Sequence, residues 1–320
     1  MSFKKKLELE GVIPATLISF NEDFSIDEKE SRKHISFCAG TKGISAITVN
    51  GHSSEIHACN FEEQKHILSI SLEEVGDKIP IINGVYADGS IEASKIAKMS
   101  NDLGASALLC FPPQSMSMGG HLRPEMAIEH FKRIAEKTDL PLICFNYPVS
   151  GNLSYPFETL LKLFEKIPTI RAVKDWCNDP MLHEKHIRVF QNLDQPVNVL
   201  TTHSSWLMSS LVMGAKGLLS GAGSVIADLQ VKLFNAVKSN DLSNAKEIND
   251  SIFPLVQLFY KPPFLDMHNR MKETLVILNR MDKAFVRPPL MKLPIQEIEA
   301  LRLVVEKMNL KANQNVYAAK

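Results

Sequence analysis

The chain has 320 residues, of which 45% are hydrophobic and 22% charged, an ordinary composition for a globular protein. Its 36 basic and 36 acidic side chains balance, so its charge gives no reason to expect nucleic acid or an anionic membrane as a partner. The basic N-terminus leads into no apolar stretch, so we do not expect it to be a signal peptide. No window approaches the roughly 18 apolar residues of a membrane span, and the five scattered cysteines predict reduced thiols in a cytoplasmic protein.

Short apolar runs rich in β-branched residues alternate with longer segments of helical periodicity along most of the chain. The runs that we expect to form strands are 12–19, 44–49, 79–85, 105–111, 140–146, 169–174, 197–203 and 217–220. Helices are expected between them, for example over 61–76 and 124–138, and Asn60 and Ser25 are the expected caps at two helix starts. The sequence therefore predicts strands and helices in strict alternation.

The predicted strands are apolar on both faces, which is typical of a parallel sheet covered by helices. Eight β-α units in series favour a closed (β/α)8 barrel, the TIM barrel, over the alternative of an open sheet with a separate domain. After the last strand the chain continues for roughly a hundred residues, more than one closing helix needs. Helical segments at 242–260, 266–279 and 295–308 predict a C-terminal helical bundle over 236–320, beside a barrel over 1–235.

Active sites of barrel enzymes lie at the carboxyl ends of the strands, and Lys174 is the lysine that ends an apolar strand. Lys42, Lys78 and Lys216 stand at or just before strand starts, and most other lysines lie on charged helical faces. Burial at the barrel rim is expected to disfavour the ammonium form of Lys174 and lower its pKa, which makes a neutral, nucleophilic amine available near pH 7. The alternative is a lysine paired with Asp175 or another rim carboxylate.

Further polar side chains are expected at the same rim. The turn Gly51-His52-Ser53 can direct backbone N–H groups and hydroxyls at a carboxylate. The period of two places Phe145 and Tyr147 on one face of the fifth strand, where the tyrosine hydroxyl either shuttles a proton, contacts substrate or packs against loops.

The remaining candidates at strand ends allow two interpretations each. His52 and His203 form hydrogen bonds at a rim more often than they catalyse. Ser220 and Gly221, at the end of the last strand, are expected to contact the substrate, while the glycines of 221–223 either cradle a phosphate or make the tight turn into a helix. No set of histidines and carboxylates has a metal-ligand spacing, so we expect no metal, and no zinc site among the cysteines.

Four motifs, in this order and spacing, resemble those of the dihydrodipicolinate synthase and N-acetylneuraminate lyase family of Schiff-base barrels. They are Gly-Val-Ile-Pro-Ala at 11–15, the turn at 51–55, Asn146-x-Pro148, and Val173-Lys174-Asp175. The turn is similar to the family's Gly-Thr-Thr-Gly-Glu, and the last motif is similar to its Ile-Lys-Glu. The resemblance covers nearly the whole chain, from about residue 11 to about residue 310.

The resemblance implies a lyase that forms a protonated imine between Lys174 and pyruvate or another small 2-oxo acid. It implies that the backbone at His52 and Ser53 binds the substrate carboxylate, that no cofactor or metal takes part, and that the chain forms a homodimer or homotetramer. The imine is an electron sink, so a C–C or C–O bond β to it can break.

The chain departs from the family where dihydrodipicolinate synthases bind and process their second substrate. Phe145 stands at the position of their catalytic tyrosine in the fifth strand. No arginine lies near Ser150, where those synthases hold a second carboxylate, and Gln114 and Ser115 lie where they carry a tyrosine pair. These departures argue against dihydrodipicolinate synthase activity.

Two other positions indicate a different substrate. Tyr147 lies where family members that act on 2-keto-3-deoxy sugar acids also place a tyrosine, and His52 replaces a threonine. We therefore expect an aldolase acting on such a hydroxylated acid, with Tyr147 as the first candidate for proton transfer and His52 as the second. The alternatives are a 2-oxo-acid dehydratase on the same lysine and a barrel that binds a keto acid without turnover.

Overall fold

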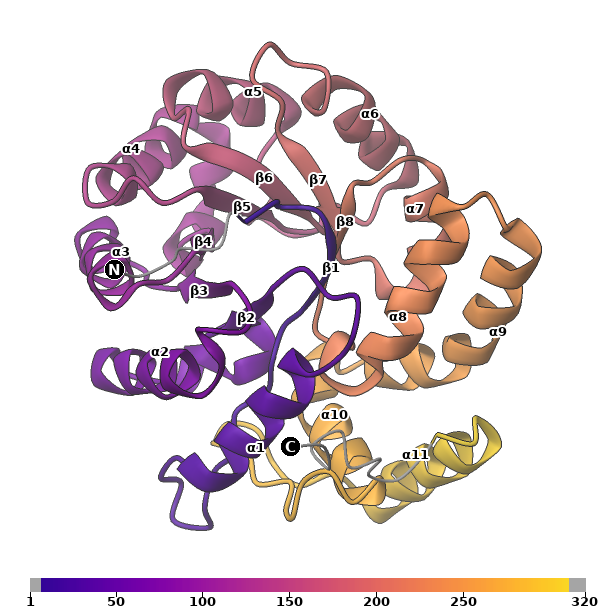
Figure 1. Ribbon diagram of the computed structural model, residues 1–320. Coiled ribbons are helices and arrows are strands. Elements are labelled where there is room, and N and C mark those ends of the chain that lie inside the picture. The colour runs from indigo at the N-terminus through magenta and orange to yellow at the C-terminus, as the bar shows by residue number, and fades with distance from the viewer. Residues whose placement is uncertain (1–6, 311–320) are drawn as a thin grey trace.

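The computed structural model describes residues 7–310 and shows a barrel of parallel strands surrounded by helices (Figure 1). The eight strands pair in the order β1-β8-β7-β6-β5-β4-β3-β2, and single bridges from Val12 to Ile44 and from Ala15 to Thr48 join its two end strands. The expected (β/α)8 TIM barrel is therefore confirmed. The strands are β1 (Gly11–Pro14), β2 (Ile47–Val49), β3 (Ile81–Val85), β4 (Ala107–Cys110), β5 (Leu142–Asn146), β6 (Ile170–Asp175), β7 (Asn198–Thr201) and β8 (Gly217–Ser220).

A helix on the outside of the barrel follows every strand, as the alternating pattern predicts. These helices are α1 (Glu28–Ala39), α2 (Phe61–Val75), α3 (Ser90–Leu103), α4 (Pro124–Ala135), α5 (Phe157–Lys166), α6 (Pro180–Phe190), α7 (Leu207–Val212) and α8 (Gly223–Lys238). Three more helices follow, α9 (Leu242–Phe259), α10 (Met267–Ile277) and α11 (Ile295–Lys307). They lie beside α8 on one side of the barrel (Figure 1).

Several strands are shorter than predicted, and one expected cap is wrong. The first strand ends at Pro14 although the buried stretch continues to Phe20, because apolar character reports burial rather than strand pairing. Asn60 caps α2 as expected, in a reciprocal capping box with Glu63. Ser25 does not cap α1; the side chain of Asp27 accepts the hydrogen bond from the backbone N–H of Glu30 instead.

The C-terminal helices share a hydrophobic cluster with α8 that is distinct from the core inside the barrel. Leu233 of α8 packs in this cluster with Leu255, Phe259 and Leu275 of the helices that follow. The predicted domain boundary between residues 235 and 236 falls inside α8, and this division stays a prediction. The cluster keeps the C-terminal helices fixed against the barrel, which matters because they supply part of the site.

Neither a membrane span nor a disulfide is found in the described part of the chain. Among residues 7–310, no helix combines the length and the apolar character that crossing a bilayer requires. All five cysteines are buried and unpaired, and burial raises the pKa of each thiol. These thiols are therefore protonated and pack as small apolar groups.

Candidate active site

Lys174 lies at the carboxyl end of β6, and its side chain is almost completely buried, with 4% exposed. Burial lowers the pKa of its amine to about 7. The Nζ atom lies 4.0 Å from the centroid of the Phe145 ring, and no carboxylate of residues 7–310 pairs with it. The alternative in which Asp175 neutralises Lys174 is therefore wrong, and a substantial fraction of the amine is neutral at pH 7.

The Lys174 amine faces a cavity of about 170 Å³ at the carboxyl end of the barrel. Among residues 7–310, no arginine, aspartate or glutamate and no second lysine belongs to the lining. Aromatic rings and small polar side chains make up most of the wall. The lining residues are Ala15, His52, Ser53, Phe145, Lys174, Trp176, Asn178, Thr202, His203, Ser204, Ser205, Trp206, Gly221, Tyr260, Phe264 and Met267.

The turn after β2 contributes His52 and Ser53 to the cavity wall, and their backbone N–H groups are unpaired within the described part of the chain. Gly51 precedes a short 3-10 helix, His52–Ser54, and the N–H groups of His52 and Ser53 have no acceptor within residues 7–310. The Ser53 hydroxyl, by contrast, donates to the carbonyl oxygen of Ala15 at 3.0 Å. The expectation that hydroxyls of this turn point at a carboxylate therefore fails for Ser53, and the backbone N–H groups are the donors that remain.

The two aromatic residues expected on one face of β5 do lie together. Phe145 lines the cavity, and the ring of Tyr147 lies 4.6 Å from it, centroid to centroid. Tyr147 is not among the lining residues; its ring meets that of His52 edge-on at 6.4 Å. Burial raises the pKa of the Tyr147 hydroxyl, so this group is a weak acid that stays protonated.

His52 lines the cavity, and its imidazole makes no hydrogen bond with any residue of the described chain. Burial, with a smaller contribution from the charge of Lys174, lowers the pKa of His52 to about 3. The ring is therefore neutral at physiological pH, with one nitrogen able to accept a proton and the other able to donate one.

The two candidates at the end of β8 have different surroundings. Gly221 lines the cavity, whereas Ser220 does not. The Ser220 hydroxyl lies 3.2 Å from that of Ser204 and accepts a hydrogen bond from Gln230 at 3.1 Å. Ser220 therefore supports Ser204 from behind the wall rather than facing the cavity itself.

The expected hydrogen-bonding role of His203 matches its surroundings. Its Nε2 accepts a hydrogen bond from the backbone N–H of Asn178 at 2.9 Å, and its ring stacks on Trp206. Burial lowers the pKa of His203 to about 3, so this ring is also neutral.

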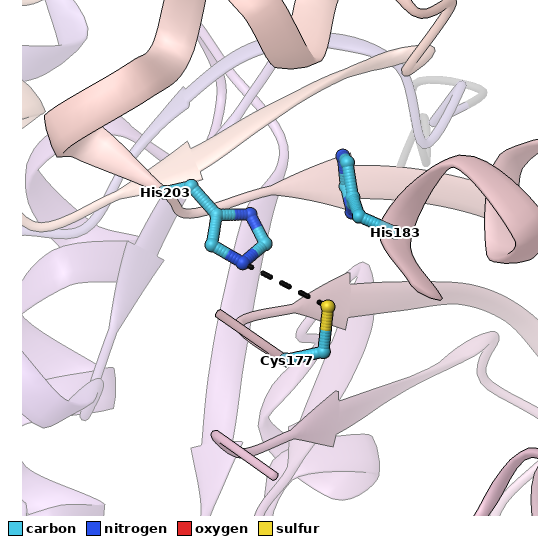
Figure 2. A group of neighbouring side chains, drawn as sticks. All are labelled: Cys177, His183 and His203. Atoms are coloured by element: carbon cyan, nitrogen blue, oxygen red, sulfur yellow. Dashed lines mark hydrogen bonds between the residues drawn. The ribbon is translucent and has the colours of Figure 1, made fainter. Parts of the chain in front are cut away.

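The fold brings Cys177, His183 and His203 together, a cluster that the sequence spacing did not indicate (Figure 2). Their potential ligand atoms lie within 4.8 Å of one another. The nitrogens are already engaged, however: His203 accepts from the Asn178 N–H, and both nitrogens of His183 form hydrogen bonds. A metal ion would have to break these bonds, so the cluster fits a hydrogen-bond network better than a metal site.

Asp175 is the centre of that hydrogen-bond network, a role that the sequence analysis did not predict. Its carboxylate accepts hydrogen bonds from His183 at 2.7 Å and His186 at 2.8 Å, and from Asn146 at 3.2 Å. Burial alone would raise the pKa of Asp175, but these bonds hold it well below its usual value. The spacing of His183 and His186 on the helix after β6 is the signal that could have indicated a shared partner.

Three cavity residues come from the C-terminal segment, and no sequence signal indicated them. Tyr260, Phe264 and Met267 close one side of the cavity. The Tyr260 hydroxyl accepts hydrogen bonds from the hydroxyl of Ser204 and the backbone N–H of Ala222, and Phe264 stacks on Trp176 at 4.7 Å. The C-terminal helices therefore complete the site as well as cover the barrel.

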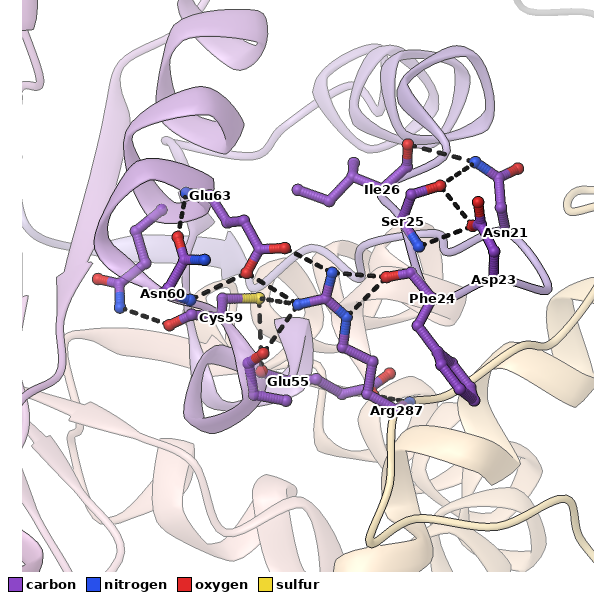
Figure 3. Close-up of polar contacts among 12 residues, drawn as sticks. Asn21, Asp23, Phe24, Ser25, Ile26, Glu55, Cys59, Asn60, Glu63 and Arg287 are labelled. Carbon is purple, nitrogen blue, oxygen red and sulfur yellow. Dashed lines mark hydrogen bonds and ion pairs between the residues drawn. The ribbon is translucent and has the colours of Figure 1, made fainter.

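The same C-terminal segment fixes the turn that carries His52 and Ser53. Arg287 donates to both carboxylate oxygens of Glu63 and to the carbonyl oxygens of Phe24 and Ala58 (Figure 3). Glu55, which has a left-handed backbone with φ of 54°, accepts from the Arg287 backbone N–H and from the buried Lys272. Lys272 and Arg287 thus both hold the turn after β2 in place.

A parallel barrel with a desolvated lysine at the end of its sixth strand defines the class of Schiff-base lyases, the class I aldolases. The chain belongs to the Dihydrodipicolinate synthetase family, whose model matches residues 8–308. The family resemblance seen in the sequence motifs is confirmed, and the protein is a lyase of this family.

Relatives and solved structures agree with this membership. The chain is 28% identical to a 4-hydroxy-tetrahydrodipicolinate synthase of Methanopyrus kandleri over 309 residues, 95% of this chain and 97% of the relative. It is 24% identical to an uncharacterized DapA-like lyase of Thermofilum pendens, covering 94% and 98%. The dihydrodipicolinate synthase structure of Aquifex aeolicus matches with a TM-score of 0.85 at 23% identity, covering 96% of this chain and 100% of the other. YagE of E. coli K12, solved in complex with pyruvate, matches with a TM-score of 0.86 at 19% identity, covering 94% and 99%.

Proposed function

We propose that Lys174 forms an imine with pyruvate or another 2-oxo acid, and that the protein is an aldolase acting on a 2-keto-3-deoxy sugar acid or a similar hydroxylated acid. The observation that carries this proposal is a lysine without a carboxylate partner among residues 7–310, with its pKa lowered to about 7, at the wall of the cavity. A lysine with no partner is costly to bury, so its retention there favours a chemical role.

The first steps need only the groups already described. The neutral amine attacks the ketone carbon, water leaves, and a protonated imine forms. The N–H groups of His52 and Ser53 are the proposed partners of the substrate carboxylate. Cleavage of the C–C bond β to the imine sends its electron pair into the imine and yields an enamine, while the hydroxyl on the departing carbon gives its proton to a base and becomes the carbonyl of a released aldehyde. The enamine is then protonated at carbon, and water hydrolyses the resulting imine to release pyruvate and restore the amine.

The composition of the wall supports a hydroxylated substrate. No arginine or further lysine is available there to hold a second carboxylate, so a dicarboxylate intermediate would leave a charge without a partner. Asn178, Thr202 and Ser205 offer amide and hydroxyl groups that suit sugar hydroxyls. This set supports a sugar acid over the dicarboxylate chemistry named for the Methanopyrus relative.

We assign proton transfer at the substrate to His52 rather than to Tyr147. His52 lines the cavity and its neutral ring makes no hydrogen bond within the described chain, whereas Tyr147 lies outside the lining and contacts the edge of His52. On this assignment Tyr147 orients the imidazole. A dehydratase on the same lysine would use the same groups and break a C–O bond.

We further propose a homo-oligomer, a homodimer or homotetramer as the family resemblance implies. Support comes from large apolar side chains on the β4–α4 connection, where Met118 is 87% and Leu122 is 79% exposed. Light scattering over a concentration series measures the mass; a monomer at all concentrations would contradict this part of the proposal.

The function is tested by trapping 2-oxo acids with borohydride and measuring the intact mass. We expect one reduced pyruvyl adduct per chain, followed by retro-aldol release of pyruvate from at least one 2-keto-3-deoxy sugar acid. Coupled assays with aspartate semialdehyde should give little or no turnover. Product analysis separates C–C from C–O cleavage, and an adduct without turnover of any substrate would favour a binding protein.

A further inference from the structure

Three histidines pack against one another beside the cavity, and the proposed chemistry uses only one of them. His52 lies in the 3-10 helix after β2, His57 in the next short helix, Ile56–Ala58, and His268 in α10. The ring centroids of His52 and His268 are 5.6 Å apart, and those of His268 and His57 are also 5.6 Å apart. The centroids of His52 and His57 are 6.5 Å apart, so segments more than two hundred residues apart bring the three imidazoles into one compact cluster.

The histidine cluster reaches two separate hollows in the molecule. His52 lines the Lys174 cavity. His57 lines a second hollow of about 340 Å³ with Tyr86 and Asp88. His268 is fully buried, and its ring lies equally far from those of His52 and His57.

Two nitrogens of the histidine cluster have no hydrogen-bond partner within residues 7–310. The Nε2 atoms of His57 and His268 are both buried and unpaired, while Nδ1 of His268 contacts the carbonyl oxygen of Ser53 at 3.4 Å. Leaving a buried polar atom without a hydrogen-bond partner is unfavourable. Rings that served only packing would be less costly as phenylalanines, so these nitrogens point to a role that needs imidazole.

We propose that His52, His268 and His57 form the path by which protons move between the substrate on Lys174 and the hollow at His57, an inference that rests on the proposed function. When the C3–H bond of a pyruvyl imine breaks, its electron pair forms the enamine double bond and the imine pair moves to nitrogen. The proton goes to one nitrogen of His52, whose other nitrogen releases a proton toward His268. From there it passes to His57 and leaves at the second hollow; protonation of the enamine runs in reverse.

The protonation states suit a relay of this kind. Each ring must be neutral, so that one nitrogen accepts a proton as the other releases one. Burial lowers the pKa of all three histidines, to about 3 for His52 and well below the usual value for His268. Neighbouring positive charge adds to this effect at His52, through Lys174, and at His268, through Lys272.

The test compares imine formation with proton exchange, using pyruvate as the probe. Borohydride trapping measures the imine, and loss of the C3 proton signal of pyruvate in D₂O, followed by NMR, measures exchange. We expect His57→Ala to keep the adduct and to slow exchange by at least about tenfold, because a positioned acid–base group contributes roughly 10²–10⁴-fold. His268→Gln should behave in the same way.

Chemical rescue separates a relay from a structural role. Added imidazole can enter the open hollow at His57, so it should restore most of the exchange in His57→Ala and little in His268→Gln, where the lost ring is fully buried. His66→Gln, a change of a half-exposed histidine on α2 paired with Glu28, is the matched control and should leave exchange unchanged.

The outcomes distinguish this proposal from the one on which it rests. A wild-type protein without any pyruvate adduct overturns the Schiff-base proposal, and the relay with it. A normal adduct with unchanged exchange in His57→Ala overturns the relay alone, as does slowed exchange in His57→Ala that imidazole does not restore. Since His57 is only partly buried, this variant is expected to fold even if His268→Gln does not.

Discussion

Two lysines are buried among residues 7–310, and they have opposite surroundings. Lys174 faces the cavity beside Phe145 without a carboxylate partner, whereas Lys272 of α10 forms an ion pair with the buried Glu55. Each amine lies over an aromatic ring, at 4.0 Å from Phe145 and 4.5 Å from Phe20 respectively.

Burial lowers the pKa of both lysines, but the consequences differ. Glu55 counteracts the effect at Lys272, where the charged pair ties the C-terminal helices to the turn after β2. Nothing counteracts it at Lys174, whose pKa falls to about 7. The comparison indicates that desolvation yields a neutral, nucleophilic lysine only where no carboxylate lies beside the amine.

The largest effect is expected at Lys174 itself. Lys174→Ala should abolish the borohydride adduct and all turnover, because no other lysine lines the cavity. Intact mass and a pyruvate-release assay measure the two results, with circular dichroism as the check on folding. Lys272→Met should still form the adduct at Lys174. An adduct that persists in Lys174→Ala would remove the central claim.

The next effect concerns the group that moves protons beside the unpaired lysine. His52→Ala should reduce single-turnover cleavage roughly 10²–10⁴-fold while imine trapping remains nearly intact. Tyr147→Phe should cost less, since this hydroxyl forms no hydrogen bond within the described residues and lies outside the cavity lining. The reverse order of losses would return the role to Tyr147, the residue that sequence resemblance placed first.

A third prediction tests the paired lysine. Lys272→Met leaves Glu55 charged and buried without its cation, so we expect the free energy of unfolding to fall by about 3–5 kcal/mol in urea titrations. Lys98→Met, which removes an exposed pair with Asp102, is the control and should cost less than about 1 kcal/mol. The double variant Lys272→Met/Glu55→Gln should recover part of the loss. If Lys272→Met and the control lowered the free energy of unfolding equally, the Lys272–Glu55 pair would not be what fastens the C-terminal helices to the turn after β2.

The contrast between the two lysines also shows which features of the site can be predicted from the sequence and which cannot. Lys174 was found because strand order fixes which end of a barrel carries chemistry, and the lysine ends an apolar strand. Lys272 looks like any polar residue of a C-terminal helix. Its burial arises from contact with a turn more than two hundred residues away, and no local pattern encodes such a contact.

The same limit applies to the rest of the site. Eight alternating units predicted the barrel, and the turn at 51–53 was placed at its rim. Tyr260 and Phe264 reach the cavity only because α9 folds back over the barrel, and the Asp175 network depends on how α6 packs against β6. The strand lengths were overestimated because hydrophobicity measures burial, which continues beyond the last ladder hydrogen bond.

The last prediction concerns the pH dependence of adduct formation, for which we expect the smallest change, counted per pH unit. Only the neutral amine attacks a ketone, so adduct formation should rise about tenfold per pH unit below 7 and level off above it, with a midpoint near the pKa of about 7. Protonation at low pH removes the nucleophilic amine, so the rate of adduct formation falls as the pH falls. His52 does not contribute to this limb, because its pKa of about 3 lies far below it. Initial rates of pyruvate trapping with cyanoborohydride, read by intact mass, give the profile.

Phe145 provides the variant that links this midpoint to desolvation. Its ring lies against Nζ of Lys174 and excludes water, so Phe145→Ala should raise the pKa of the amine and move the midpoint toward the ordinary lysine value. Phe145→Leu keeps an apolar side chain at the same place and should shift it less. If both variants leave the midpoint near 7, this ring does not set the pKa. A wild-type midpoint near the pKa of a solvated lysine would show that burial does not lower the pKa of the Lys174 amine. The difference in surroundings between Lys174 and Lys272 would then not explain a difference in reactivity.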